Sequence, residues 1–342
     1  AIRIANDMLV AKVPHPEFYV LRAEAYNSIG DFGKAEYDAH EAMRLFPEST
    51  NGLFQLAMAE QGLGQLDSAE FHLRQVKRRA PTAEVCYRLA IVQQMRGQLP
   101  DALLQESEAI AMSTPDDPVT APFHRVKGEI NAMMGDTASA HIELDKAVAL
   151  APKDPVNYNS RGFYLHAWLG DHKGAISDYN KAIKINPNYS YVFNNRGWSL
   201  YKLGETEKGI KDIERARKKK PSNPYTYRNL GVIALETGDT ARACGYFRES
   251  LQKGFTALYG DEVEKLVAVS CKNLTANHPY LEVELSLLVA IDPAARPLLT
   301  GQLESPSGVL GLITALPEIN PLSENLLLTS STGSVSTTYT IP

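Results

Sequence analysis

Apolar residues recur along most of the chain at the three- and four-residue spacing of amphipathic helices, in stretches that glycines separate. Each of these glycines follows one apolar helical stretch and precedes another. They stand at spacings of 34, 33, 38, 35, 34 and 34 residues: Gly30, Gly64, Gly97, Gly135, Gly170, Gly204 and Gly238. Prolines recur with nearly the same step: Pro47, Pro81, Pro115, Pro152, Pro187 and Pro221. A fixed period of this length indicates an architecture of stacked repeats.

Four of these glycines are followed directly by aspartate: Gly30-Asp31, Gly135-Asp136, Gly170-Asp171 and Gly238-Asp239. Glycine readily adopts the left-handed backbone conformation that ends a helix. An aspartate side chain can accept a hydrogen bond from the free amides at the start of the next helix. The glycine and the two apolar stretches around it therefore predict one helical hairpin in each repeat.

Small residues recur where the two helices of a hairpin must approach closely. In the first helix they are Ala23, Ala57, Ala90, Gly128, Gly162, Gly197 and Gly231. In the second helix they are Ala35, Ala69, Ala102, Ala140, Ala175, Gly209 and Ala243. A larger side chain at such a position would force the helices apart or strain the core.

The small residue, the aromatic residues, G-D-x-x-x-A and the closing proline at a period of 34 residues resemble tetratricopeptide repeats. The resemblance implies an all-α fold, a right-handed superhelical solenoid of helical hairpins. It covers seven repeats: 16–49, 50–82, 83–120, 121–154, 155–189, 190–223 and 224–255. The fifth repeat carries one extra residue near Trp168, which is expected to change its local geometry.

The two ends of this array have their own patterns. Residues 1–14 resemble the second helix of a partial repeat, with Ala1, Ala5 and Met8 in register. Such a half repeat leaves a packing face uncovered, so we expect the natural chain to begin earlier or to be processed. Residues 256–273 have apolar side chains at helical spacing and resemble the helix that caps such arrays.

The tail, residues 274–342, has a different composition, rich in Ser, Thr, Leu and Pro and without Lys or Arg after Arg296. Its last residues alternate with a period of two, which places Val335, Thr337, Tyr339 and Ile341 on one side of a strand. A flexible tail and a small β element are both open.

Composition excludes several classes of protein. A net charge of −5 and 44% hydrophobic residues indicate a folded chain without a global bias toward nucleic acid or anionic membranes. The longest apolar runs are far shorter than the roughly 20 residues of a membrane span. The cysteines, Cys86, Cys244 and Cys271, are far apart and lack CxxC spacing, so we expect buried small side chains rather than disulfides or a zinc site. We expect a soluble protein, with a cytoplasmic location favoured over a periplasmic or secreted one.

No motif for catalysis or cofactor binding is present. The chain has no phosphate-binding G-x-x-x-x-G-K-[ST], no HExxH and no G-x-S-x-G, and its histidines are scattered. Helix capping and pairing along helix surfaces account for the carboxylates. We therefore predict a protein that is not an enzyme and has no cofactor, no metal site and no small-molecule substrate.

Two basic runs, residues 76–81 and 214–221, end the second helices of their repeats. Cations at this place stabilise the free carbonyl groups and the negative end of the helix dipole. That role is favoured over nucleic-acid binding through residues 215–220, which would depend steeply on salt concentration.

The family resemblance implies that first helices line a concave groove that binds peptides or helices. Residues four apart share a helical face, and the later repeats combine Asn and Arg with aromatic side chains there. Asn can hold a peptide backbone, Arg can bind a carboxylate, and aromatic rings supply contact area. The predicted groove residues are Arg125, Asn159, Phe163, Tyr191, Asn194, Trp198, Tyr201, Tyr225 and Arg228. The alternative for the Asn and Arg residues is that they bind one another or the backbone between adjacent first helices.

These features favour a non-catalytic adaptor that binds a peptide or protein segment. Two alternatives stay open. The repeats could be the regulatory or substrate-docking module of a larger enzyme. They could also bind an acidic C-terminal tail as co-chaperones do, since Asn159, Asn194 and Arg228 partly resemble a carboxylate clamp, although Trp198 is bulky where that clamp is open. The partner cannot be named from a fold that is a generic binding surface.

Overall fold

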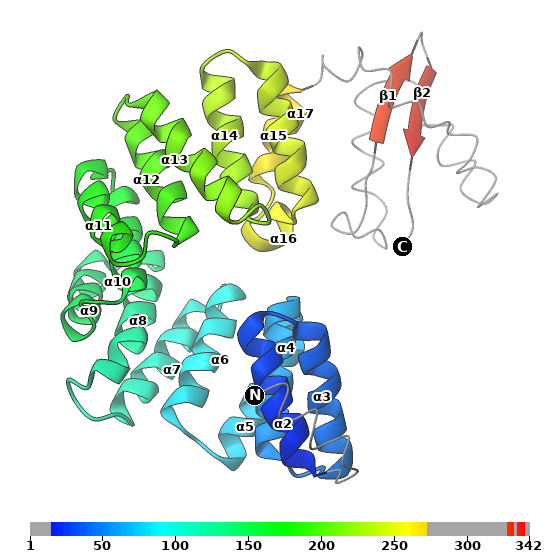
Figure 1. Ribbon diagram of the computed structural model, residues 1–342, viewed down its shortest axis with the longest axis vertical. Helices are drawn as coiled ribbons and strands as arrows, with labels where there is room; N and C mark the ends of the chain where they lie inside the picture. The colour runs from blue at the N-terminus through cyan, green and yellow to red at the C-terminus, as the bar shows by residue number, and fades with distance from the viewer. Residues whose placement is uncertain (1–14, 272–326, 332–333, 339–342) are drawn as a thin grey trace. The chain divides into compact units, whose positions relative to one another are not determined.

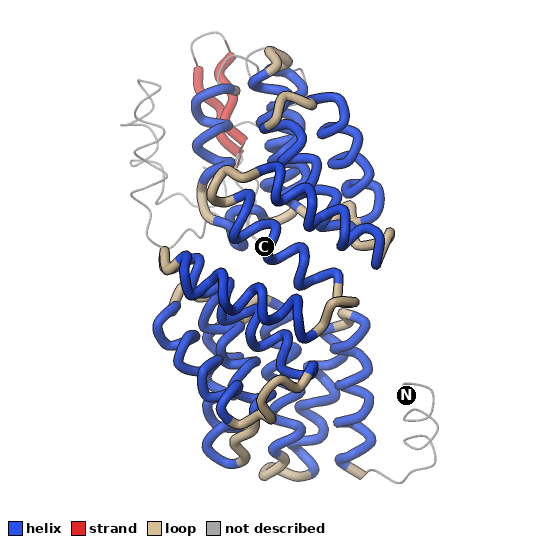
Figure 2. Tube along the Cα trace, turned by 90° about the vertical axis from the view of Figure 1, so that its left-hand side faces the viewer, coloured by secondary structure: helices blue, strands red, loops and turns tan. Residues whose placement is uncertain are grey.

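The computed structural model describes residues 15–271, 327–331 and 334–338, and helices make up nearly all of the first range (Figures 1 and 2). The expected partial repeat, residues 1–14, and most of the tail lie outside the described residues. The chain divides into two compact units, which we call the N-terminal unit, Ala1–Tyr189, and the C-terminal unit, Ser190–Pro342. Each is described by itself.

The N-terminal unit is a series of helical hairpins. In each, the two helices pack on each other, and the second helix packs on the first helix of the next hairpin as far as α10. The elements are α2 (Pro16–Ile29), α3 (Phe32–Leu45), α4 (Thr50–Leu63), α5 (Leu66–Arg79), α6 (Ala83–Met95), α7 (Leu99–Ala111), η1 (Pro118–Thr120), α8 (Ala121–Met133), α9 (Thr137–Leu150), α10 (Pro155–Arg161), η2 (Gly162–Ala167) and α11 (His172–Ile185).

The C-terminal unit continues the same pattern. Its elements are α12 (Ser190–Lys202), α13 (Thr206–Lys219), α14 (Pro224–Glu236), α15 (Thr240–Gln252), α16 (Phe255–Tyr259), α17 (Glu262–Ser270), β1 (Leu327–Ser331) and β2 (Ser334–Thr338). Helices α16 and α17 occupy the segment expected to cap the array. In the tail, β1 and β2 pair antiparallel, with Leu327 opposite Thr338.

The turns between paired helices are built as the sequence pattern predicts. All seven periodic glycines have positive φ angles, from 74° at Gly97 to 88° at Gly238, a conformation that residues with a side chain rarely adopt. Three of the four aspartates accept a hydrogen bond from a backbone amide of the following helix: Asp136, Asp171 and Asp239, at 3.0, 2.9 and 3.0 Å. Asp31 instead accepts from the Lys34 ammonium at 2.7 Å.

The extra residue of the fifth repeat is accommodated in η2, which is a π-helix. The Trp168 amide donates to the Phe163 carbonyl at 2.9 Å, a bond that reaches five residues back. A π-helical turn takes up one inserted residue within a helix, often at functional sites. The insertion therefore changes the helix locally and leaves the Gly170 turn in place.

The small residues lie at helix crossings, as predicted, and the alanines of both series are fully buried. Gly197 of α12 shows how tight these crossings are. A Cβ atom added there would lie 2.6 Å from the Gly209 carbonyl oxygen of α13 and 2.6 Å from an Ile213 side-chain carbon. The backbones of α12 and α13 thus approach more closely than a methyl group allows.

We expect Gly197→Ala to lower the free energy of unfolding by roughly 1–2 kcal/mol, because the overpacking cost exceeds the helix-propensity gain of about 1 kcal/mol. Gly245→Ala in α15 is the matched control, since an added Cβ there meets nothing within 4 Å. It is expected to stabilise by up to about 1 kcal/mol. Urea denaturation of both variants measures the difference, and equal stabilisation by both would contradict a close crossing at Gly197.

Buried ion pairs connect the two helices of three hairpins. Arg22 pairs with Asp38 at 2.6 Å, Arg161 with Asp178 at 2.7 Å and Arg196 with Asp212 at 2.6 Å, and all three aspartates are buried. The sequence interpretation missed these pairs, although the pattern carries a signal for them. Each arginine directly precedes the small residue of the first helix, and each aspartate stands three places after the small residue of the second.

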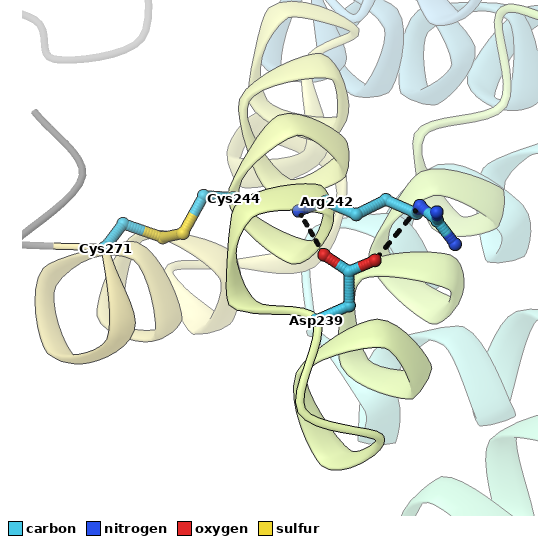
Figure 3. Close-up of a disulfide and its surroundings, with 4 residues drawn as sticks. All are labelled: Asp239, Arg242, Cys244 and Cys271. Carbon is cyan, nitrogen blue, oxygen red and sulfur yellow. Dashed lines mark hydrogen bonds and ion pairs between the residues drawn. A yellow bond between two sulfur atoms is a disulfide. The ribbon is translucent and has the colours of Figure 1, made fainter. Parts of the chain in front are cut away.

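Cys244 of α15 and Cys271 at the end of α17 form a disulfide, with their Cα atoms 5.8 Å apart (Figure 3). The expectation of three unpaired cysteines is therefore wrong for these two, and correct for Cys86, which is a buried free thiol. Sequence spacing could not reveal the bond, because the two cysteines come together only where α17 packs on α15.

Candidate functional site

The predicted site residues fall into two groups, three in the N-terminal unit and six in the C-terminal unit. Arg228 of α14 is at the centre of the second group. Its Nε donates to Glu262 Oε2 of α17 at 3.1 Å, its Nη2 also donates to Glu262, and its Nη1 donates to Asn229 at 3.0 Å. Its guanidinium carbon lies 4.9 Å from the Trp198 ring centroid and 5.7 Å from that of Tyr225. Arg228 thus already binds a carboxylate beside two aromatic rings.

Asn194 lies beneath this arginine rather than on the surface. It is 2% exposed, and its Oδ1 accepts from the Asn229 Nδ2 at 3.1 Å while its own Nδ2 donates to Asn195 at 3.2 Å. Asn229 is buried as well. The Asn229 amide thus donates to Asn194 between adjacent first helices, which is the alternative that the sequence left open for these residues. Asn194 therefore supports the position of Arg228 and does not face a ligand in this structure.

Three tyrosines form a row with a period of 34 residues, which we call the tyrosine row: Tyr191 of α12, Tyr225 of α14 and Tyr259 of α16. The Tyr225 and Tyr259 rings meet edge to face, 4.9 Å between centroids. Burial, together with nearby Tyr191 and Tyr225, raises the pKa of Tyr259. Tyr191 is 38% exposed and Tyr259 49%, so both rings are partly accessible to solvent.

Trp198 and Tyr201 lie next to this row on α12. Their ring centroids are 5.5 Å apart, and Lys202 Nζ lies 4.7 Å from the Trp198 centroid. The Tyr201 hydroxyl donates to Glu236, and burial together with this bond raises the pKa of Tyr201 to about 12. Tyr201 is therefore a neutral hydrogen-bond donor throughout the physiological pH range.

The N-terminal group is Arg125, Asn159 and Phe163. Arg125 donates to Glu129 at 2.6 Å and to the Tyr87 hydroxyl at 3.3 Å, with its side chain 15% exposed. Asn159 is half-buried on α10, and Phe163 lies in η2 with its ring 4.9 Å from that of Tyr164. As in the C-terminal unit, the arginine is bound by a carboxylate of the chain itself.

Two contributors to these clusters were not predicted, Glu262 and Tyr259. Both could have been found, because Glu262 stands 34 residues after Arg228 and Tyr259 stands 34 residues after Tyr225. The capping segment thus continues two rows of the repeats even though its helices are short. Glu262 occupies in the cap the place that Arg228 occupies in the last repeat.

The basic run at the end of α13 is largely engaged within the chain. The Arg215 guanidinium lies 4.0 Å from the Phe193 centroid, Arg217 donates to Glu214 at 2.8 Å, and Lys220 donates to the Tyr191 hydroxyl. These contacts agree with a role of the run at its own helix terminus. Lys220 also links the run to the tyrosine row.

Glu106 of α7 is a buried carboxyl group that the sequence interpretation missed. It is fully buried, and neither of its carboxyl oxygens has a hydrogen-bond partner among the described residues. Burial raises its pKa to about 10, against the opposing effect of Arg125 and with further upward contributions from Glu129 and Glu84. The group is therefore protonated at neutral pH.

This protonation makes stability depend on pH. Above the ordinary pKa of about 4.5 the unfolded chain loses the Glu106 proton while the folded chain keeps it, so stability falls as pH rises toward about 10. We expect Glu106→Gln to remove this slope and to be roughly 1–2 kcal/mol more stable than the wild type at pH 8. Urea denaturation at pH 5, 7 and 9 measures it. A parallel pH dependence of the two proteins would contradict the assignment.

The described residues offer no centre for metal chemistry. Between residues 15 and 271, no three His, Cys, Asp or Glu side chains gather in a way that could hold a metal ion. Histidines there are hydrogen-bonded to glutamates, such as His72 with Glu60 at 2.7 Å and His124 with Glu143 at 2.6 Å. In the same part of the chain, no helix is both long and apolar enough to cross a membrane.

Two family models match the chain: the TPR repeat model over residues 168–204 and the tetratricopeptide repeat model over residues 194–255. No curated protein sequence matches it. Among solved structures, the Cut9 and Hcn1 complex of the APC/C matches with a TM-score of 0.59 at 15% identity, over 78% of this chain and 51% of that chain. A tetratricopeptide repeat protein from Parabacteroides merdae matches with a TM-score of 0.59 at 16% identity, over 75% and 99%. Yeast Tom70 matches with a TM-score of 0.57 at 14% identity, over 88% and 61%.

At such identities the structural likenesses show the fold alone, and the chain spans only about half the length of the Cut9 and Hcn1 match. The family models add the repeat itself over residues 168–255, a range that includes the periodic glycines Gly170, Gly204 and Gly238. Repeats of this family generally serve as non-catalytic scaffolds for protein–protein interaction. Residues 168–255 carry tetratricopeptide repeats, and the chain has an all-α solenoid fold of the same kind.

Proposed function

We propose that the tyrosine row and Arg228 form the surface on which this scaffold binds an extended protein segment that carries a carboxylate. The single observation that carries the proposal is the bond between Arg228 and Glu262, made beside Trp198 and Tyr225. An arginine binds a carboxylate through two parallel hydrogen bonds, and flanking aromatic rings hold its plane. Glu262 is the internal occupant that a partner carboxylate replaces.

The neighbouring groups suit the rest of such a segment. Tyr191 and Tyr259 are exposed at the two ends of the row, and each tyrosine combines apolar contact area with a hydroxyl group. Lys202 and Lys220 lie over the rings of Trp198 and Tyr191, which adds positive charge to the surface. The combination favours an acidic, extended segment over a purely apolar helix.

The test uses a synthetic peptide array in which each peptide is present with a free and an amidated C-terminus. We expect the wild type to prefer acidic peptides, and Arg228→Gln to weaken their binding about tenfold or more, as the loss of a charge-assisted hydrogen bond does. Glu262→Gln is expected to strengthen binding several-fold, because it frees Arg228 and keeps the shape of the side chain.

Tyr37→Ser is the matched control, since Tyr37 is an exposed tyrosine of the N-terminal unit and lies outside the proposed surface. Circular dichroism reports whether each variant stays folded. Unchanged binding by Arg228→Gln would contradict the proposal. The preference for free over amidated C-termini decides whether the bound carboxylate is a chain terminus or a side chain.

A further inference from the structure

An exposed apolar side chain recurs on the outer face of four second helices in the N-terminal unit. It stands two places after the small residue of that helix and is 56–67% exposed in each case: Tyr37, Phe71, Leu104 and Ile142. Single exposed apolar residues are normal on protein surfaces, so this series alone indicates nothing. Phe71 differs from the others by what surrounds it.

Phe71 lines a cavity of about 290 Å³ that we call the outer pocket, formed by Phe71, Arg74, Lys77, Arg78, Leu89 and Gln105. Four of these residues come from α5, Leu89 comes from α6, and Gln105 comes from α7 (Figure 1). Leu89 is 1% exposed and supplies an apolar floor between the two second helices. The volume is near the lower limit for small-molecule sites, roughly 300 Å³, and so suits one large apolar side chain.

Three cations line the outer pocket, and no carboxylate does. Arg74 is held by Glu70 at 2.7 Å, and Lys77 donates to Gln105 at 2.6 Å and also to Glu108. Within the described part of the chain, Arg78 makes no ion pair and is exposed. The first two cations are thus fixed in place by their partners, and Arg78 is left to pair with an external anion.

We propose that the outer pocket docks an acidic segment of a partner protein, which inserts one large apolar side chain over Leu89 and places a carboxylate on Arg78. The charge of Arg78, which no ion pair among the described residues balances, favours an acidic partner. The apolar floor and the exposed Phe71 ring favour a protein segment over a nucleic acid, whose binding would need several unpaired cations along a backbone. The surface uses second helices of the N-terminal unit, so it is distinct from the tyrosine row and lies beyond the proposed function.

The test is selection of binders from an unbiased peptide display library, followed by fluorescence anisotropy with the selected peptides. We expect a class of acidic peptides with one Leu, Phe or Trp, whose binding falls at least tenfold in Phe71→Ser and several-fold in Arg78→Gln. Tyr37→Ser is the matched control, because it removes an equally exposed ring outside the pocket and should bind as the wild type does. Arg228→Gln should also leave this class unaffected, which separates it from ligands of the tyrosine row.

Four results would overturn the proposal. The first is that no acidic class appears among the selected peptides, and the second is that Phe71→Ser binds them as the wild type does. The third is that Tyr37→Ser loses as much peptide binding as Phe71→Ser, and the fourth is that Arg228→Gln loses binding of the same peptides. Polyuridylate binding that needs Arg78 but not Phe71 would assign the pocket to nucleic acid instead. Self-association that Phe71→Ser abolishes would assign it to a second copy of this chain. Melting curves of Phe71→Ser and Arg78→Gln confirm that lost binding is not lost folding.

Discussion

Reduction of the Cys244–Cys271 disulfide is expected to lower the free energy of unfolding of the C-terminal unit by about 3–4 kcal/mol. The bond joins residues 27 apart in the sequence, and closing a loop of that length removes this much conformational entropy from the unfolded chain. Helix α17 has only nine residues, and a helix so short is not stable by itself. Its hold on α15 comes from the disulfide and from apolar side chains such as Val263, Leu266 and Val267.

The measurement is urea denaturation with and without a reductant, together with hydrogen exchange of the α17 amides. The Cys244→Ala/Cys271→Ala variant is the control, because a reductant should no longer change its stability. Exchange should rise first in α17, since a locally detached cap opens before the repeats unfold. Since α17 carries Glu262, the same treatment should also free Arg228. Identical denaturation curves for the oxidised and reduced protein would contradict a stabilising role of the bond.

Arg161→Ala is expected to cost about 3 kcal/mol of stability. Arg161 of α10 donates to both carboxylate oxygens of buried Asp178, at 2.8 and 2.7 Å, and to Asp145 at 2.8 Å. Removing one partner of a buried ion pair leaves an uncompensated charge, which typically costs 3–5 kcal/mol. The lower end applies here because the Lys181 ammonium lies 3.6 Å from the Asp178 carboxylate and compensates part of its charge.

A double variant separates the effect of the unpaired charge from the effect of the lost side-chain volume. Arg161→Met combined with Asp178→Leu removes both charges and keeps apolar volume, so it should recover much of the stability that Arg161→Ala loses. Lys181→Ala is the control, as it removes an exposed cation and should change stability by less than about 1 kcal/mol. The free energies come from urea denaturation. Equal losses in Arg161→Ala and in the double variant would contradict the burial argument.

The helical hairpins were predictable because each is specified by local sequence. The positive φ angle at Gly204 follows from the place of a glycine between two apolar stretches, and the close crossing at Gly197 follows from the series of small residues. Both depend on steric limits of the backbone and of neighbouring helices, which act over a few residues and repeat with the period. The same periodic pattern could also have predicted the Arg–Asp ion pairs of three hairpins.

The burial and the bonding partners of the candidate site residues were not predictable in the same way. Arg228 was assigned to the site from its repeat position, and what it binds depends on whether α17 returns to place Glu262 beside it. Asn194 shares its row with Asn159, yet its contact with Asn229 draws it beneath the surface. A repeat position tells which side of a helix a residue faces, and the neighbouring repeat decides whether that side is open to a partner.

The sequence by itself determined the elements of this protein, its repeats and the turns that join its helices, because the physical causes are local and periodic. Only the tertiary structure decided the non-local partners. It paired Cys244 with Cys271, set Glu262 on Arg228, buried Glu106 with no hydrogen-bond partner among the described residues, and formed the outer pocket beside Phe71. Each of these depends on how one hairpin packs on the next, and packing of that kind responds to the volume and charge of many side chains at once.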